Sequence, residues 1–216
     1  MALTATIYTF DVDLAHADRG VYESLAVRAA RHPSESEDSL VTRVLAYCLE
    51  HTEGIAFSTG GLSEPSEPAL AVRDLTGRIT TWIEIGAPDA ARIHKASKAA
   101  QRVAVYTHKD PDKLLAQWTG ERIHRAADVE LYALDRALVA SLVARLQRRM
   151  AFALSVTGGQ LYVTLGALRC ERSPTPVRVG VNTSWPARAS SGRTRFQIQP
   201  PRQAPCTRTK LAMRSP

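Results

Sequence analysis

The stretch "TTWIEIGAPDAARIHKASKAA" (residues 80–100) decides the fold, because it joins a strand to a helix. Its first part is rich in β-branched and aromatic residues and ends at Gly86, and Pro88 or Asp89 then opens a helix to about residue 102. Glu84 lies inside the strand, which otherwise has the composition of a buried one. A carboxylate in such a setting needs a partner, and a metal ion, a lysine or an arginine are the usual ones.

The residues on either side extend this unit. "HPSESEDSLVTRVLAYCLEH" (residues 32–51) predicts a helix capped by Ser34 or Ser36, with an apolar stripe behind its acidic first turn. Three strand-like segments follow in a hairpin pattern, and "VAVYT" (103–107) predicts a strand after the second helix. These three segments are "GIAFSTG" (54–60), "PALAVRD" (68–74) and "GRITTWIEIG" (77–86). The predicted order is therefore helix, three strands, helix, strand.

The flanking sequence predicts further elements around this core. Residues 3–13 alternate as a strand does, and residues 21–31 return as a second strand, although "ESLAVRAA" would also suit a helix. The hairpin "FALSVTGGQLYVTLG" (152–166) turns at Gly158-Gly159. Between residues 112 and 149 we expect a short helix, a strand and a helix, carried by "DKLLAQW", "VELYAL" and "DRALVASLVARLQRR". The prediction is one mixed α/β domain, residues 1–171, whose central mixed sheet is flanked by helices and extended by N-terminal and C-terminal β-hairpins.

The basic charge of the chain is concentrated at its end. The formal net charge is +7, yet residues 172–216 contain eight arginines, Lys210 and no acidic residue, so residues 1–171 carry 19 basic and 21 acidic side chains. This tail also holds seven of the twelve prolines. Such a composition predicts a mostly disordered segment that could bind nucleic acid or acidic partners nonspecifically.

Composition also narrows the class of protein. Of the 216 residues, 44% are hydrophobic, which is enough for a substantial core. The start of the chain does not resemble a signal peptide, and no apolar stretch approaches the roughly 20 residues of a membrane span, so we expect a cytoplasmic protein. The three cysteines have no metal-ligand spacing, and Cys48 fits the apolar stripe of its helix.

Three acidic residues form the candidate metal site. Asp74 closes the second central strand, Glu84 lies near the end of the third, and Glu35 begins the preceding helix. Residues at matching heights on adjacent strands lie within about 5 Å, so Asp74 and Glu84 are expected to share a Mg²⁺ ion, with Glu35 as a third ligand. The competing interpretation is that both strand-end acids are solvated edge residues.

Four motifs together resemble the YaeQ family of bacterial proteins over nearly all of residues 1–168. They are "ARHPSESEDSLVTRVLAYCLE", "FSTGGLSEPSEPAL", "WIEIGAPDAARIHKA" and "LYVT". Members of that family are similar in fold to PD-(D/E)XK nucleases, whose core has the same order of helix, three strands, helix and strand. The resemblance implies no established biochemical activity.

The nuclease resemblance implies roles for particular residues. Asp74 and Glu84 match the two acids that hold Mg²⁺ in these nucleases, and Glu35 matches an assisting glutamate of the first helix. The usual lysine two positions after the glutamate is absent, because that position is Gly86. Some superfamily members supply this cation from the following helix, where Lys95 is the candidate.

Three more cations complete the predicted site. Arg92 and Lys98 lie on the same basic side of that helix as Lys95, and Arg73 stands beside Asp74. Each is a candidate phosphate-binding residue. The alternatives are a solvated helix face for the first two and an ion pair with a neighbouring acid for Arg73.

Two functions remain open from the sequence. The first is a divergent Mg²⁺-dependent nuclease acting on nucleic-acid phosphodiesters, with Lys95 stabilising the transition state. The second is a non-catalytic, nuclease-derived binding or regulatory module in which the acids and Lys95 form a structural ion-pair network. The missing lysine and the absence of excess positive charge in residues 1–171 favour the second, whereas the three acids at corresponding positions favour the first.

Overall fold

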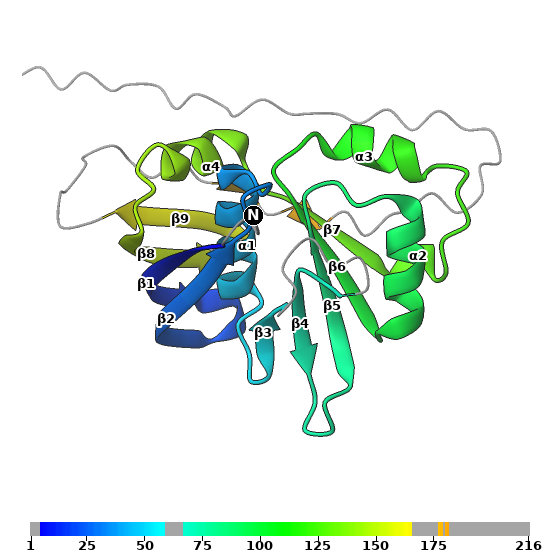
Figure 1. Ribbon diagram of the computed structural model, residues 1–216, viewed down its shortest axis with the longest axis horizontal. Helices are drawn as coiled ribbons and strands as arrows, with labels where there is room; N and C mark the ends of the chain where they lie inside the picture. The colour runs from blue at the N-terminus through cyan, green and yellow to red at the C-terminus, as the bar shows by residue number, and fades with distance from the viewer. Residues whose placement is uncertain (1–4, 59–66, 166–176, 179, 182–216) are drawn as a thin grey trace, which may run out of the picture. The chain divides into compact units, whose positions relative to one another are not determined.

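The computed structural model describes residues 5–58, 67–165, 177–178 and 180–181 (Figure 1). All described residues belong to one compact unit within residues 1–185. None of the helices in these described ranges combines the length and the hydropathy required to cross a membrane.

The two terminal hairpins form a sheet of their own. The strand order is β10-β9-β8-β1-β2, and β1 pairs antiparallel with β2 and parallel with β8. Both predicted hairpins are therefore confirmed, and residues 21–31 form a strand rather than a helix because they pair with β1 along their whole length. The strands are β1 (Thr6–His16), β2 (Val21–Arg31), β8 (Arg149–Thr157), β9 (Gln160–Leu165) and β10 (Val177–Arg178).

The second sheet contains the predicted core. Its order is β11-β7-β6-β5-β4-β3; β3, β4 and β5 are antiparallel, whereas β5, β6 and β7 are parallel. The strands are β3 (Ile55–Phe57), β4 (Leu70–Arg73), β5 (Ile79–Ile85), β6 (Arg102–Thr107), β7 (Val129–Ala133) and β11 (Gly180–Val181).

Four helices flank the two sheets, and the predicted order of helix, three strands, helix and strand is observed. Ser36 caps α1 and Asp89 caps α2, each accepting a hydrogen bond from a backbone N–H of the first turn. The last helix is shorter than predicted, since it ends at Val143, and Arg149 already belongs to β8. The helices are α1 (Glu37–Leu49), α2 (Ala90–Ala99), α3 (Pro111–Trp118) and α4 (Arg136–Val143).

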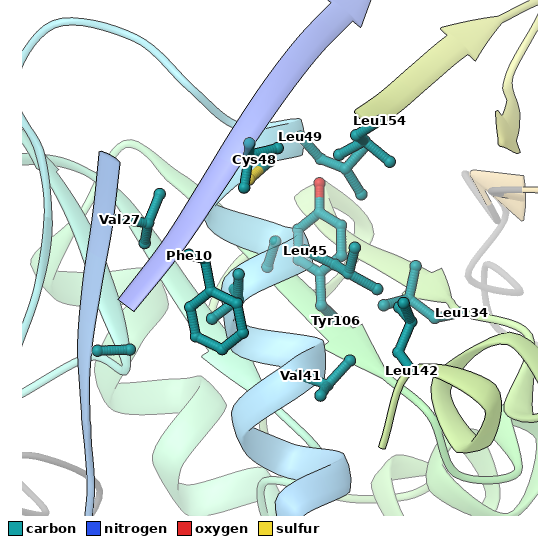
Figure 2. Packing of buried hydrophobic residues seen from close by; sticks show 14 of the residues in the cluster. Phe10, Val27, Val41, Leu45, Cys48, Leu49, Tyr106, Leu134, Leu142 and Leu154 are labelled. Carbon is teal, nitrogen blue, oxygen red and sulfur yellow. The ribbon is translucent and has the colours of Figure 1, made fainter. Parts of the chain in front are cut away.

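Helix α1 is the centre of the core. Most of its residues are buried, including Val41, Leu45 and Cys48, which is typical of a helix covered on all sides. One hydrophobic cluster joins α1 to Phe10 of the first sheet and Tyr106 of the second (Figure 2). The helix therefore packs between the sheets and holds them together.

The opposite face of the second sheet is covered by α2 and α3. Ile93 of α2 and Leu114 and Trp118 of α3 pack with residues of β6 and β7. A smaller cluster places Trp82 of β5 against Ala96 of α2. Each helix connects two parallel strands, as α/β crossovers require, so the start of α2 lies at the carboxyl end of β5.

Most of the predicted tail lies outside the described residues. Two short strands within it are described: β10 pairs with β9, and β11 pairs with β7. Strand pairing thus continues beyond the predicted domain boundary at residue 171. The predicted disorder of residues 172–216 falls largely on residues that the structure does not describe.

Candidate functional site

Glu84 is buried at the carboxyl end of β5, with 2% of its surface exposed. Its Oε1 accepts hydrogen bonds from Trp82 Nε1 at 2.6 Å and from Arg92 Nε at 2.7 Å. Burial raises the pKa of the Glu84 carboxyl, although the Trp82 hydrogen bond and the Arg92 charge lower it in part. The sequence allowed a metal ion, a lysine or an arginine as the partner of Glu84, and in the structure this partner is an arginine, Arg92.

Arg92 connects three parts of the chain. It lies in the first turn of α2, where its backbone N–H donates to the Asp89 cap at 2.7 Å. Its guanidinium also donates from Nη2 to the carbonyl oxygen of Glu67 at 2.8 Å. A cation in the first turn is disfavoured by the helix dipole, and the pairing with Glu84 offsets this penalty.

Asp74 lies far from this site, so the predicted proximity of Asp74 and Glu84 is wrong. Its carboxylate accepts hydrogen bonds from Thr76 and from the backbone N–H of Arg78, within the hairpin that joins β4 to β5. These hydrogen bonds hold the pKa of Asp74 below its usual value. Since Arg73 pairs with Ile79, five residues before Glu84, about 16 Å of strand separates the two acids.

The error comes from the direction of β4. A tight hairpin makes two strands antiparallel, so the end of the first strand meets the start of the second. The part of β4 beside Glu84 is therefore its beginning, where Leu70 pairs with Ile83. Glu67 lies three residues before Leu70, and its carboxylate accepts the hydroxyl hydrogen bond of Ser58. Glu67 is thus an acidic residue near the beginning of β4 that the sequence prediction did not consider, although the short hairpin could have indicated this end of the strand.

Glu35 belongs to a separate buried ion pair rather than to the predicted metal site. Arg43 of α1 donates to both of its carboxylate oxygens, at 3.1 and 2.9 Å, and both side chains are almost fully buried. Arg43 also donates to the carbonyl oxygen of Ala30 and lies over the Phe57 ring. Burial raises the pKa of Glu35 and lowers that of Arg43, and in both cases the partner opposes the shift.

The other predicted cations are exposed. Lys95 and Lys98 are exposed residues of α2, and the side chain of neither makes a hydrogen bond or ion pair with another described residue. Arg73 lies at the distant hairpin, where its guanidinium donates to the carbonyl oxygen of Gly77 at 3.1 Å. The residue that α2 supplies to Glu84 is therefore Arg92, and Arg73 does not lie near it.

Few of the described side chains near Glu84 could act as ligands of a metal ion. Among the described residues there is no group of three or more acidic, histidine or cysteine side chains that could hold a metal ion. Arg92 contacts the carboxylate of Glu84 and the backbone carbonyl oxygen of Glu67, whose own carboxylate accepts a hydrogen bond from Ser58. Mg²⁺ is commonly held by one or two carboxylates together with water and substrate phosphate, and the predicted trio of Asp74, Glu84 and Glu35 is not brought together to hold it.

A second charged cluster lies at the other end of β6 and was not predicted. Arg102 donates to both carboxylate oxygens of Glu50, at 2.7 and 2.8 Å, and also to Glu130. Tyr106 donates its hydroxyl to Glu50, and Tyr132 donates to Glu130. Burial opposes the ionisation of Glu50, but the hydrogen bonds and charge of Arg102, with smaller contributions from Tyr106 and Arg19, together outweigh burial and lower its pKa. This cluster ties the end of α1 to β6 and β7.

Comparisons with known proteins agree on one family. A family model described as YaeQ protein matches residues 1–174. The chain is 32% identical over 165 residues to a protein of Escherichia coli strain K12 named "Uncharacterized protein YaeQ", covering 76% of this chain and 91% of that protein. A Salmonella typhi protein of the same name is similar to the same extent.

Solved structures of YaeQ proteins have the same fold as this chain. The YaeQ protein from Pseudomonas syringae superposes with a TM-score of 0.72 at 29% identity, covering 84% of this chain and 97% of that one. The YaeQ protein from Xanthomonas axonopodis pv. citri gives a TM-score of 0.66 at 26% identity, with 83% and 98% coverage. The sequence match and the shared fold together show that this chain belongs to the YaeQ family.

Proposed function

We propose that this YaeQ-family chain is a divergent PD-(D/E)XK-type nuclease that binds Mg²⁺ and a nucleic-acid phosphodiester at Glu67, Glu84 and Arg92. The order of α1, three strands, α2 and β6 supports the fold analogy. Proteins that share a fold can have different functions, so the proposal depends on the side chains around Glu84 rather than on the fold.

The observation that carries the proposal is the convergence of Glu67 and Glu84 on Arg92. The guanidinium contacts the Glu84 carboxylate and the backbone of Glu67, which places the start of β4 beside the end of β5. Both hydrogen bonds from Trp82 and Arg92 to the Glu84 carboxylate end on Oε1, and no described residue donates to Oε2. One oxygen of Glu84 and the carboxylate of Glu67, which also accepts a hydrogen bond from Ser58, would then be the ligands that the described residues offer to a hard cation.

Each residue has a distinct role in this proposal. Bound Mg²⁺ would polarise the phosphate and lower the pKa of its water. Glu84 and Glu67 hold the cation, and Trp82 fixes the orientation of the Glu84 carboxylate through its hydrogen bond. Arg92 can present its guanidinium to phosphate oxygens, and Lys95, which follows it by three residues, adds positive charge on the exposed side of α2.

The alternative function is a non-catalytic, nuclease-derived binding or regulatory module. The observation in its favour is that Arg92 already pairs with Glu84, so a cation must compete with an existing ion pair. In this case the pair fixes α2 on the sheet, and its loss lowers stability without any effect on metal binding.

A titration with Mn²⁺, followed by calorimetry, separates the two functions. We expect the wild-type chain to bind Mn²⁺ and both Glu84→Gln and Glu67→Gln to weaken binding at least tenfold, because each removes a charged ligand from a hard ion. The matched control is Asp74→Asn, which should bind as the wild type does because Asp74 lies in the distant hairpin. If the wild-type chain takes up no Mn²⁺, the proposed metal site is wrong and the non-catalytic module is supported.

Lys95 provides a test of catalysis as distinct from metal binding. Lys95→Ala should leave Mn²⁺ affinity within about twofold and abolish cleavage of a nucleic-acid substrate, because the exposed side chain stabilises charge in the transition state rather than the metal. The control is Lys98→Ala, one turn farther from Arg92, which should retain most of the activity. Equal cleavage by both variants would remove Lys95 from the mechanism.

A further inference from the structure

Strand β2 forms a long free edge of the first sheet. It pairs with β1 over all eleven residues without a shift in register, and no other described strand pairs with its outer side. Proteins usually protect sheet edges by short strands, proline residues or bulges, because unpaired peptide groups attract another strand. None of these three devices occurs in β2, although it carries the charged side chains of Glu23, Arg28 and Arg31, which also protect edges.

The hydrogen-bond pattern shows which peptide groups point outward. The backbone N–H of Thr9 in β1 donates to Arg148 on the β8 side, so its partner Arg28 directs its peptide groups away from β1. The carbonyl oxygen of Ala30 also points away from β1, because it accepts a hydrogen bond from Arg43 of α1. Since this direction alternates along a strand, the even-numbered residues of β2 expose their peptide groups at the edge.

Part of this edge is covered and part is open. At the carboxyl end of β2, Arg43 donates a hydrogen bond to the carbonyl oxygen of Ala30, and Arg31 donates one to the carbonyl oxygen of Glu35. The open segment therefore runs from Tyr22 to Arg28, both of which are exposed, with Leu25 at its midpoint.

We propose that a second copy of this chain pairs with the open edge, antiparallel and centred on Leu25. Tyr22 then lies opposite Arg28 of the second copy, and Leu25 lies opposite its own equivalent. All outward peptide groups between residues 22 and 28 find partners, because even-numbered residues meet even-numbered residues. The result is a symmetric dimer in which the first sheet continues from one copy into the other.

The side chains of this segment suit a second copy in that register. Tyr22 has 67% of its surface exposed, and Arg28 of the other copy would lie beside its ring, where cation–π contact is favourable. Glu23 lies opposite Val27, so no like charges face each other across the new pairing. The dimer is independent of the function proposed for Glu67, Glu84 and Arg92.

The first test is the mass in solution as a function of concentration. Sedimentation of the full chain should show the 23.6 kDa monomer giving way to twice that mass as the concentration rises. Ala26→Pro removes an N–H that points to solvent in the monomer, so it should abolish the dimer while the thermal midpoint stays unchanged. Ala26→Ser keeps the N–H and serves as the control that still dimerises.

The second test fixes the register. Leu25→Cys, in a chain that also carries Cys170→Ser and Cys206→Ser, should form a disulfide-linked dimer on mild oxidation. The two positions would form a non-hydrogen-bonded pair with Cα atoms about 4.5 Å apart, within the range that a disulfide spans. Glu23→Cys in the same chain should remain uncrosslinked, because it faces Val27. A monomer at every concentration, or a dimer that persists in Ala26→Pro, overturns the proposal.

Discussion

Replacement of Arg43 by alanine is expected to destabilise the protein by about 3–5 kcal/mol, because it leaves the Glu35 carboxylate buried without its cation. Both side chains of this pair are almost fully buried, so solvent cannot replace the lost partner. The same change removes the hydrogen bond to Ala30 and the contact with the Phe57 ring. Since small domains are stable by only about 5–15 kcal/mol, the variant should unfold at a much lower urea concentration.

The pH dependence of the Arg43→Ala variant shows whether the unpaired Glu35 carboxylate causes the loss of stability. Burial already raises the pKa of Glu35 in the folded protein, and loss of Arg43 raises it further. When the pKa of a carboxyl group is higher in the folded protein than in the unfolded one, the group is protonated in both states below the unfolded pKa, and its burial then costs no stability through charge. The free energy of unfolding falls as the pH rises from the unfolded pKa towards the folded pKa. Urea unfolding followed by tryptophan fluorescence should therefore show a larger deficit at pH 7.5 than at pH 5.

The matched control for Arg43 is the double replacement Arg43→Met with Glu35→Gln. It removes both charges, so no unpaired carboxylate remains and the loss of stability should be clearly smaller than for Arg43→Ala. A deficit as large as that of the single variant would assign the effect to packing around Phe57 instead of to the buried charge.

Arg102→Ala should cost about 2–3 kcal/mol, because Glu50 and Glu130 lose their shared cation. Glu50 is largely buried, whereas 35% of the Arg102 side chain is exposed, so solvent screening keeps the effect below that of a fully buried pair. The control is Arg149→Ala, which breaks an exposed ion pair with Asp11 and should change stability by less than about 0.5 kcal/mol.

The sign of the pH dependence should reverse in the Arg102 variant. In the wild type the pKa of Glu50 is lowered, so its stabilising contribution is present above the unfolded pKa and is lost as the pH falls through the folded value. Without Arg102, burial dominates and raises this pKa, so acidification should increase stability. A difference in thermal midpoint between the wild type and Arg102→Ala that stays constant from pH 7.5 to pH 4, instead of shrinking on acidification, would contradict this role of Arg102.

Local sequence determined the order and type of the elements in this YaeQ-family chain. Ser36 and Asp89 mark the starts of α1 and α2 because side-chain caps act within one helical turn. The Gly158-Gly159 turn marks the second hairpin because both glycines adopt positive φ angles. The need of Glu84 for a partner was also evident, since its neighbours along the strand are apolar.

Tertiary structure decided which residues meet. The sequence predicted Asp74 and Lys95 as the neighbours of Glu84, whereas the fold provides Arg92, which also contacts the backbone of Glu67. It also assigned Glu35 to a metal site, whereas that carboxylate pairs with Arg43. Caps, turns and periodicity depend on residues close in the chain, but the neighbours of a buried charge depend on strand direction and register, which pairing across the sheet establishes.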